Sequence, residues 1–156
     1  MTARMMGIVA LMVMVGLASA TAPALAQSNC KQIKGDQEGV FDPGTNTTSG
    51  PVRHAEWLNG TYVAAFRPGA APTQDPTTVT FLGDYTLTTN QGELKVFNVY
   101  LLNGAGVGTV LGRINPATST GIFAGATGTV YFAVTVTSFD PFTVKEALSG
   151  EICFAQ

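Results

Sequence analysis

Four polar side chains in the second half of the chain could bind or orient a small molecule. Tyr85 lies in "FLGDYTL", Asn98 and Tyr100 lie in "VFNVYLL", and Arg113 lies in "VLGRIN". Tyrosine and asparagine can place a polar tip inside an apolar pocket, and a guanidinium can bind a carboxylate or a phenolate. Arg113 would serve a pocket only if its strand face points inward. The favoured interpretation is a surface arginine whose stem covers apolar side chains.

Conventional catalytic groups are few. His54 is the only histidine and has no serine or cysteine partner in a triad context, so a structural or surface role is favoured. Glu146 has the same strand parity as Val144 and Leu148. An inward carboxylate would have a raised pKa and could act as acid or base, whereas an outward position near a turn is the favoured interpretation. The sequence has no metal-ligand cluster and no cofactor motif, so we expect neither group.

Two cysteines, Cys30 and Cys153, stand near opposite ends of the chain. In an exported protein such a pair most simply forms a disulfide. Closing a loop of this length would stabilise the fold by about 4–5 kcal/mol in the chain-entropy model. The pair also predicts that the two ends of the folded chain are neighbours in space.

The first 26 residues have the pattern of a secretory signal peptide. Arg4 is followed by an apolar run and then by small residues that include Ala24-Leu25-Ala26. The run is short for a membrane anchor, which is the alternative interpretation. We expect cleavage near Gln27 and a secreted or periplasmic protein, with no membrane association after cleavage.

The remaining chain has the length of one domain and carries little charge. The whole sequence has eight Lys and Arg residues against ten Asp and Glu residues. This balance gives no electrostatic reason for binding nucleic acid or an anionic membrane.

From residue 77 onward the pattern is that of β-strands. In 127–138, Val130, Phe132 and Val134 alternate with threonines and Tyr131, which places Phe132 on an apolar face. Turn residues separate several such segments, and no long segment has helical period. The predicted fold is all-β, a single antiparallel closed barrel of about eight strands, with a β-sandwich as the alternative.

Before that region the pattern is weaker. Residues 27–51 are rich in turn residues and are interpreted as an irregular lead-in, so the barrel domain is placed at 52–156. Asn59-Gly60 indicates a tight hairpin, with a helix over 52–58 as the competing possibility.

A glycine-rich segment, "TGIFAGATG" (120–128), leads into the strand at 127–138, and "GEIC" (150–153) closes the chain. Together these segments resemble the allene oxide cyclase and dirigent group of small β-barrels. The matching residues of the first segment are Thr120, Gly121, Phe123, Gly125, Ala126 and Gly128. The resemblance covers about residues 77–154.

This resemblance implies an eight-stranded barrel with an apolar interior pocket, commonly in a homotrimer. It implies a hydrophobic small molecule as the partner, whose cyclisation or coupling could be steered by shape without a cofactor. No catalytic residue of those proteins can be matched here. The alternative function is a secreted structural or interaction barrel of the inhibitor kind. Under the first hypothesis, the expected ligand-binding residues are Tyr85, Asn98, Tyr100, Arg113 and Phe132.

Overall fold

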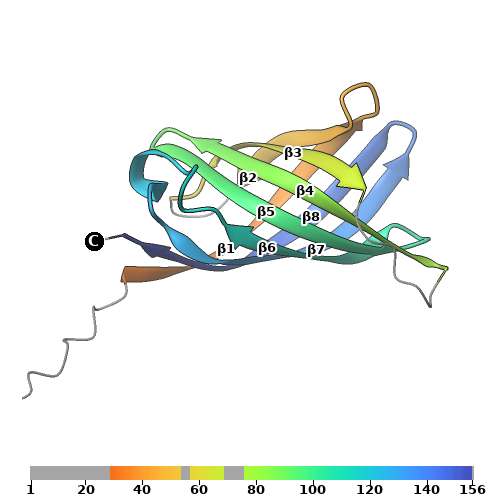
Figure 1. Cartoon of the computed structure of the whole chain (residues 1–156). Helices are drawn as coiled ribbons and strands as arrows, with labels where there is room; N and C mark the ends of the chain where they lie inside the picture. The colour runs from red at the N-terminus through yellow and green to blue at the C-terminus, as the bar shows by residue number, and fades with distance from the viewer. Residues whose placement is uncertain (1–28, 54–56, 69–75, 156) are drawn as a thin grey trace, which may run out of the picture.

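The chain folds into a closed barrel of eight antiparallel strands (Figure 1). The structure is a computed structural model and describes residues 29–53, 57–68 and 76–155. Each strand pairs with the next along the chain, and the last pairs with the first. The strands are β1 (Asn29–Asp42), β2 (Thr47–Arg53), β3 (Gly60–Pro68), β4 (Thr78–Thr89), β5 (Gly92–Asn103), β6 (Val107–Ile114), β7 (Thr127–Phe139) and β8 (Phe142–Phe154). The predicted barrel is therefore confirmed, and the sandwich is not formed.

The period-two pattern of the sequence decides which side chains fill the barrel. In β7, Val130, Phe132 and Val134 are buried, whereas Tyr131 and Thr135 are exposed. Because successive side chains of a strand point to opposite faces, one register fixes the whole interior face. No helix among the described residues is long and apolar enough to cross a membrane.

The interpretation of 27–51 as an irregular lead-in was wrong, because these residues supply β1 and β2. β1 pairs with β8 over most of its length, from Asn29 opposite Phe154 to Val40 opposite Thr143. Its buried positions carry only one large aliphatic side chain, Ile33, together with Gln37 and a glycine, so the hydrophobic alternation is faint. The turn-rich residues form only the β1–β2 hairpin and parts of its strands. The barrel therefore begins at Asn29.

The segment around Asn59-Gly60 also differs from both predictions. Gly60 is the first residue of β3 and pairs with Val52, so Asn59-Gly60 is not a two-residue hairpin turn. Val52 and Arg53 belong to β2, which excludes a helix that starts at Val52. His54 and the expected signal peptide lie outside the described residues.

The disulfide between Cys30 and Cys153 is confirmed. The two residues are direct partners in the β1–β8 pairing, with their Cα atoms 3.9 Å apart. The bond therefore joins the two strands whose pairing closes the barrel.

The glycine-rich segment covers one end of the barrel, which we call the capped end. Its short 3₁₀ helix, η1 (Gly121–Phe123), places the Phe123 ring inside with no exposed surface, while Ile122 remains 44% exposed. The Phe123 ring lies 6.4 Å from that of Trp57 and 6.3 Å from that of Phe154. Gly121 has φ of +60°, and a Cβ there would meet the Gln91 carbonyl oxygen at 2.0 Å. This close approach explains why glycine is needed there.

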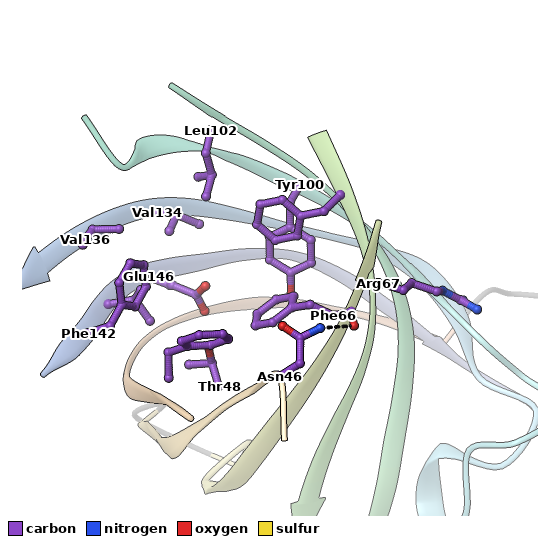
Figure 2. Close-up of a pocket in the computed structure, with 13 residues that line it drawn as sticks. Asn46, Thr48, Phe66, Arg67, Tyr100, Leu102, Val134, Val136, Phe142 and Glu146 are labelled. Atoms are coloured by element: carbon purple, nitrogen blue, oxygen red, sulfur yellow. Dashed lines mark hydrogen bonds between the residues drawn. The ribbon is translucent and has the colours of Figure 1, made fainter. Parts of the chain in front are cut away.

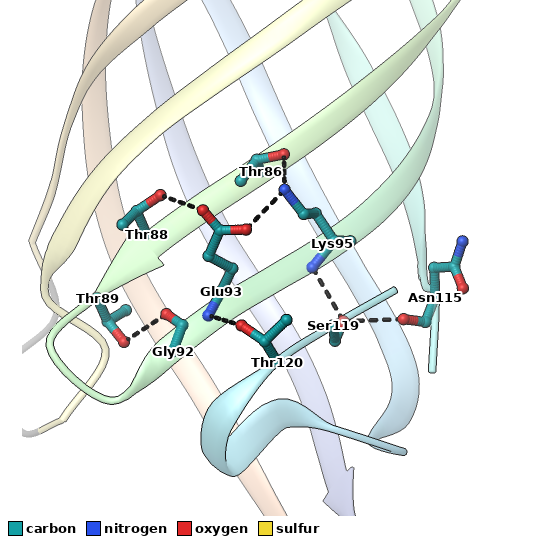
Figure 3. Close-up of polar contacts among 9 residues, drawn as sticks. All are labelled: Thr86, Thr88, Thr89, Gly92, Glu93, Lys95, Asn115, Ser119 and Thr120. Carbon is teal, nitrogen blue, oxygen red and sulfur yellow. Dashed lines mark hydrogen bonds and ion pairs between the residues drawn. The ribbon is translucent and has the colours of Figure 1, made fainter. Parts of the chain in front are cut away.

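Polar contacts attach residues 115–120, at and just before the start of this segment, to the β4–β5 hairpin (Figure 3). The Glu93 amide donates to Thr120 Oγ1 at 3.1 Å, and the Lys95 amide donates to Ser119 Oγ at 3.0 Å. The Ser119 hydroxyl in turn donates to the Asn115 carbonyl oxygen at 2.8 Å. The segment therefore continues the sheet along β5 before it turns over the barrel end.

Candidate ligand-binding pocket

The opposite end of the barrel holds a pocket of about 350 Å³ (Figure 2). We call this the pocket end; the β1–β2, β5–β6 and β7–β8 hairpins lie there. A volume in this range is typical of small-molecule sites. The pocket is lined by Phe41, Asn46, Thr48, Phe66, Arg67, Phe81, Tyr100, Leu102, Val134, Val136, Phe142, Val144 and Glu146.

One wall of the pocket is made of aromatic rings from three adjacent strands. Phe81 of β4 and Tyr100 of β5 are register partners, and their rings stack with centroids 4.7 Å apart. Phe66 of β3 meets both rings edge-on, at 5.3 and 5.1 Å. A Cβ at Gly83 would lie 2.8 Å from the Tyr100 ring and 3.4 Å from the Phe66 ring. Glycine at this position therefore leaves room for the aromatic wall.

The other side of the pocket is mostly aliphatic. Val134 and Val136 of β7 and Val144 of β8 line it. Phe41 and Phe142 complete the rim with an edge-on contact at 5.5 Å. Such a lining suits an apolar molecule, which gains free energy by leaving water.

A single carboxyl group interrupts this apolar lining. Glu146 of β8 is 9% exposed, and its Oε2 accepts a hydrogen bond from the Gln37 side-chain amide. Gln37 Oε1 accepts in turn from the Tyr85 hydroxyl at 2.8 Å. The two donors therefore act in series toward Glu146, and among the described residues no donor reaches its Oε1.

Burial controls the protonation of this group. Loss of hydration raises the pKa of the Glu146 carboxyl to about 7, and the hydrogen bond from Gln37 opposes that rise. Burial, together with the Glu146 charge, also raises the pKa of the Tyr62, Tyr85 and Tyr100 hydroxyls. These tyrosines therefore stay neutral where Glu146 titrates.

Four of the five predicted ligand-binding residues lie inside the barrel. Tyr100 lines the pocket. Asn98 is buried beneath it and donates to the Tyr100 hydroxyl at 3.1 Å. Tyr85 is part of the Glu146 network, and the Phe132 ring lies 5.4 Å from the Tyr85 ring.

Arg113 lies outside the barrel, so the favoured interpretation as a surface arginine is confirmed and its place among the expected ligand-binding residues is not supported. It is exposed, as are Val107 and Leu111, the residues with which it is in phase. The buried residues of β6 are Val110, Gly112 and Ile114, of the opposite parity. An inward face was considered because Val107 and Leu111 are apolar and in phase with Arg113, but both lie on the outer surface of the barrel.

Glu146 lies inside the barrel, so the outward position favoured for it was wrong. Its parity with buried Val144 and Leu148 had given the right signal. Gln37 was missed because β1 had not been recognised as a strand.

No protein-family model, curated protein or solved structure matches this chain. Among the described residues, the only three potential metal ligands that lie together are Cys30, Glu151 and Cys153. Two of them form the disulfide, so their sulfurs are not available as thiolates.

Proposed function

We propose that the protein is an exported barrel that binds a small, largely apolar molecule in the pocket end. The observation that carries this proposal is a pocket of about 350 Å³ with an aromatic wall, an aliphatic wall and one buried carboxyl. Ligand sites in proteins commonly combine an apolar lining with few polar groups that fix orientation. Residues placed in this way can give both affinity and a preferred binding pose.

The same pocket could steer a reaction by its shape. A rigid apolar cavity that holds a reactive chain in one conformation favours one product of cyclisation or coupling, without a cofactor. The Phe66, Phe81 and Tyr100 rings are fixed by contacts with one another, which is the rigidity such control needs. The resemblance to the allene oxide cyclase and dirigent group agrees with this extension of the proposal.

Export is part of the proposal. The leader pattern of residues 1–26 and the disulfide both fit an oxidising compartment, either the periplasm or the exterior of the cell.

The test compares two adjacent leucines that point to opposite faces. Leu102 lines the pocket, and Leu101 lies on the outer surface. Binding of the fluorescent apolar probe N-phenyl-1-naphthylamine would be titrated with wild type, Leu102→Trp and Leu101→Trp. Tryptophan at position 102 fills the pocket, so we expect probe affinity to fall at least about tenfold, with no change for Leu101→Trp. Equal affinities for all three proteins would overturn the proposal.

A specific observation favours a second function, that of an interaction barrel. Val99, Leu111 and Tyr131 lie side by side across the outer face of β5, β6 and β7, and all three are exposed. An exposed apolar patch often marks an interface. The expected homotrimer would use such a surface, and light scattering on Leu111→Glu tests it: loss of a wild-type oligomer supports the interface, and a monomeric wild type argues against it.

A further inference from the structure

The charge of the pocket specifies the head group of its ligand. Resting on the proposed function, we infer that the pocket selects amphiphiles with a protonated amine, whose ammonium group binds Glu146 while the apolar body fills the ring-lined space. Such a ligand differs from the carboxylate or phenolate that an inward Arg113 would have favoured.

Nothing in the described pocket neutralises an anionic ligand. The only basic residue that lines it is Arg67, whose side chain points away from the other lining residues (Figure 2). Arg67 forms an ion pair with Asp84 at 3.1 Å and lies over the outer-face ring of Phe97 at 5.4 Å. A ligand carboxylate would therefore meet Glu146 without a compensating cation, which is unfavourable in a buried site.

The direction of the hydrogen bonds around Glu146 also favours a ligand that donates. Tyr85 donates to Gln37, and Gln37 donates to Glu146, so the carboxyl is the acceptor at the end of this series. Its Oε1 accepts from none of the described residues, and Glu146 lines the pocket. A ligand that donates a charge-assisted hydrogen bond to Oε1 satisfies this acceptor, and an ammonium also neutralises the carboxylate.

The aromatic wall of the pocket is also suited to a cation. The faces of aromatic rings carry partial negative charge and attract cations. Phe66, Phe81 and Tyr100 stand on the wall of the same pocket as Glu146. Ring faces and a carboxylate together form a site that is complementary to an organic cation and suited to its apolar body.

None of the described groups around Glu146 neutralises its charge, although the buried Tyr62 hydroxyl has no hydrogen-bond partner in the described chain. Across the interior it faces the Tyr62, Tyr85 and Tyr100 hydroxyls, which stay neutral, and Gln37 on the neighbouring strand. On β8 its neighbour Lys145 points outward and pairs with Glu38 at 3.0 Å. Glu146 is therefore the one ionisable group of the described interior that changes charge near neutral pH.

The test uses three probes with one apolar body, a 1-naphthylmethyl group that bears an amine, a hydroxyl or a carboxylic acid. Calorimetry at pH 8 would measure their affinities for wild type, Glu146→Gln and Glu38→Gln. Glu38 is the matched control because it neighbours Gln37 but points outward. We expect wild type to prefer the amine over the alcohol by about tenfold to a hundredfold, the range for a charge-assisted hydrogen bond, and to bind the acid weakest. Glu146→Gln should lose this preference, and Glu38→Gln should keep it.

A second readout is proton exchange with the buffer. At pH 6 most Glu146 carboxyls are protonated, so binding of an ammonium should ionise the carboxyl and release its proton to the buffer. Calorimetry in two buffers of different ionisation enthalpy detects this release, which should be absent in Glu146→Gln. Folding of each variant is checked by its thermal midpoint.

The outcomes separate this inference from the proposed function. Equal binding of amine and alcohol, or tighter binding of the acid, overturns the amine preference but leaves an apolar pocket in place. Failure of all three probes, together with failure of N-phenyl-1-naphthylamine, overturns both. An amine preference that survives in Glu146→Gln also contradicts the inference, because the cation is then bound elsewhere.

Discussion

The two ends of the barrel use aromatic residues for opposite purposes. At the capped end, Phe123 packs against Trp57 and Phe154, which also contact each other, and it has no exposed surface. At the pocket end, Phe66 and Phe81 pack against Tyr100 on one wall, and a volume of about 350 Å³ remains in front of them. Similar side chains therefore fill space at one end and enclose it at the other.

The difference comes from the connecting segments. The residues between β6 and β7 run along β5 and form hydrogen bonds with Glu93 and Lys95 (Figure 3). They then insert the Phe123 ring, which is fully buried. Among the described residues, the pocket end has no comparable segment. The cap buries a ring at one end and leaves the other end open, so we expect substitutions at the cap to change stability and substitutions at the pocket to change ligand binding.

The largest expected effect is removal of the disulfide, which lies toward the capped end. It joins residues separated by 123 positions. Replacing Cys30 and Cys153 with serine should lower the free energy of unfolding by about 4–5 kcal/mol, because the unfolded chain regains the entropy of an open loop. Denaturant titration measures this change. Affinity for N-phenyl-1-naphthylamine should be unchanged in the folded fraction, and a parallel loss of affinity would contradict the separation of the two ends.

Phe123 and its neighbour Ile122 form a matched pair at the cap. Phe123→Ala removes a fully buried ring and should cost about 3–5 kcal/mol of unfolding free energy. Ile122→Ala changes an exposed side chain and should stay within about 0.5 kcal/mol of wild type. Urea unfolding of both variants tests this prediction, and similar values for the two would show that Phe123 does not seal the barrel.

Glu146 should make stability depend on pH at the pocket end. Its pKa is raised from 4.5 to about 7 in the folded protein, so the folded state binds more protons than the unfolded state between these values. Wild type should therefore lose roughly 3 kcal/mol of stability as pH rises from about 4.5 through 7, relative to Glu146→Gln. Unfolding free energies of both proteins at pH 4.5, 6 and 8 measure the difference. Parallel pH curves would mean that the carboxyl is hydrated.

The sequence predicted the strands whose interior face is strongly apolar. β7 follows from the alternation around Phe132, β8 follows from Val144, Leu148 and Ile152 although Glu146 stands on the same face, and the disulfide follows from the cysteine count. β1 could not be recognised in the same way, because it places a glutamine and a glycine inside the barrel and charged residues outside. The alternation of hydrophobic residues along a strand indicates which face is buried only where the buried side chains are apolar.

The candidate site was predictable in part for a related reason. Tyr100 and Asn98 were found because their parity follows Leu94 and Val96, which are buried. An inward Arg113 stayed open as an alternative because the outer face of β6 is also apolar, so hydropathy does not separate the two faces of that strand. The Glu146–Gln37 contact joins strands that are distant in sequence, and only the closure of β8 on β1 brings the two residues together.

The smallest expected changes in stability come from two phenylalanines at the pocket end, one on the inner face of the barrel and one on the outer face. Phe66 stands on the pocket wall and is only partly buried, whereas Phe97 lies on the outer face beneath Arg67. Phe66→Ala should lower the free energy of unfolding by about 1–2 kcal/mol, less than Phe123→Ala, because part of the ring is already hydrated. It should also weaken binding of N-phenyl-1-naphthylamine, because the ring is a wall of the pocket. Phe97→Ala should leave that affinity unchanged while its own stability loss stays small. If both variants bind the probe as wild type does, the aromatic wall is structural packing like that of the cap, and the two ends differ only in how completely they are filled.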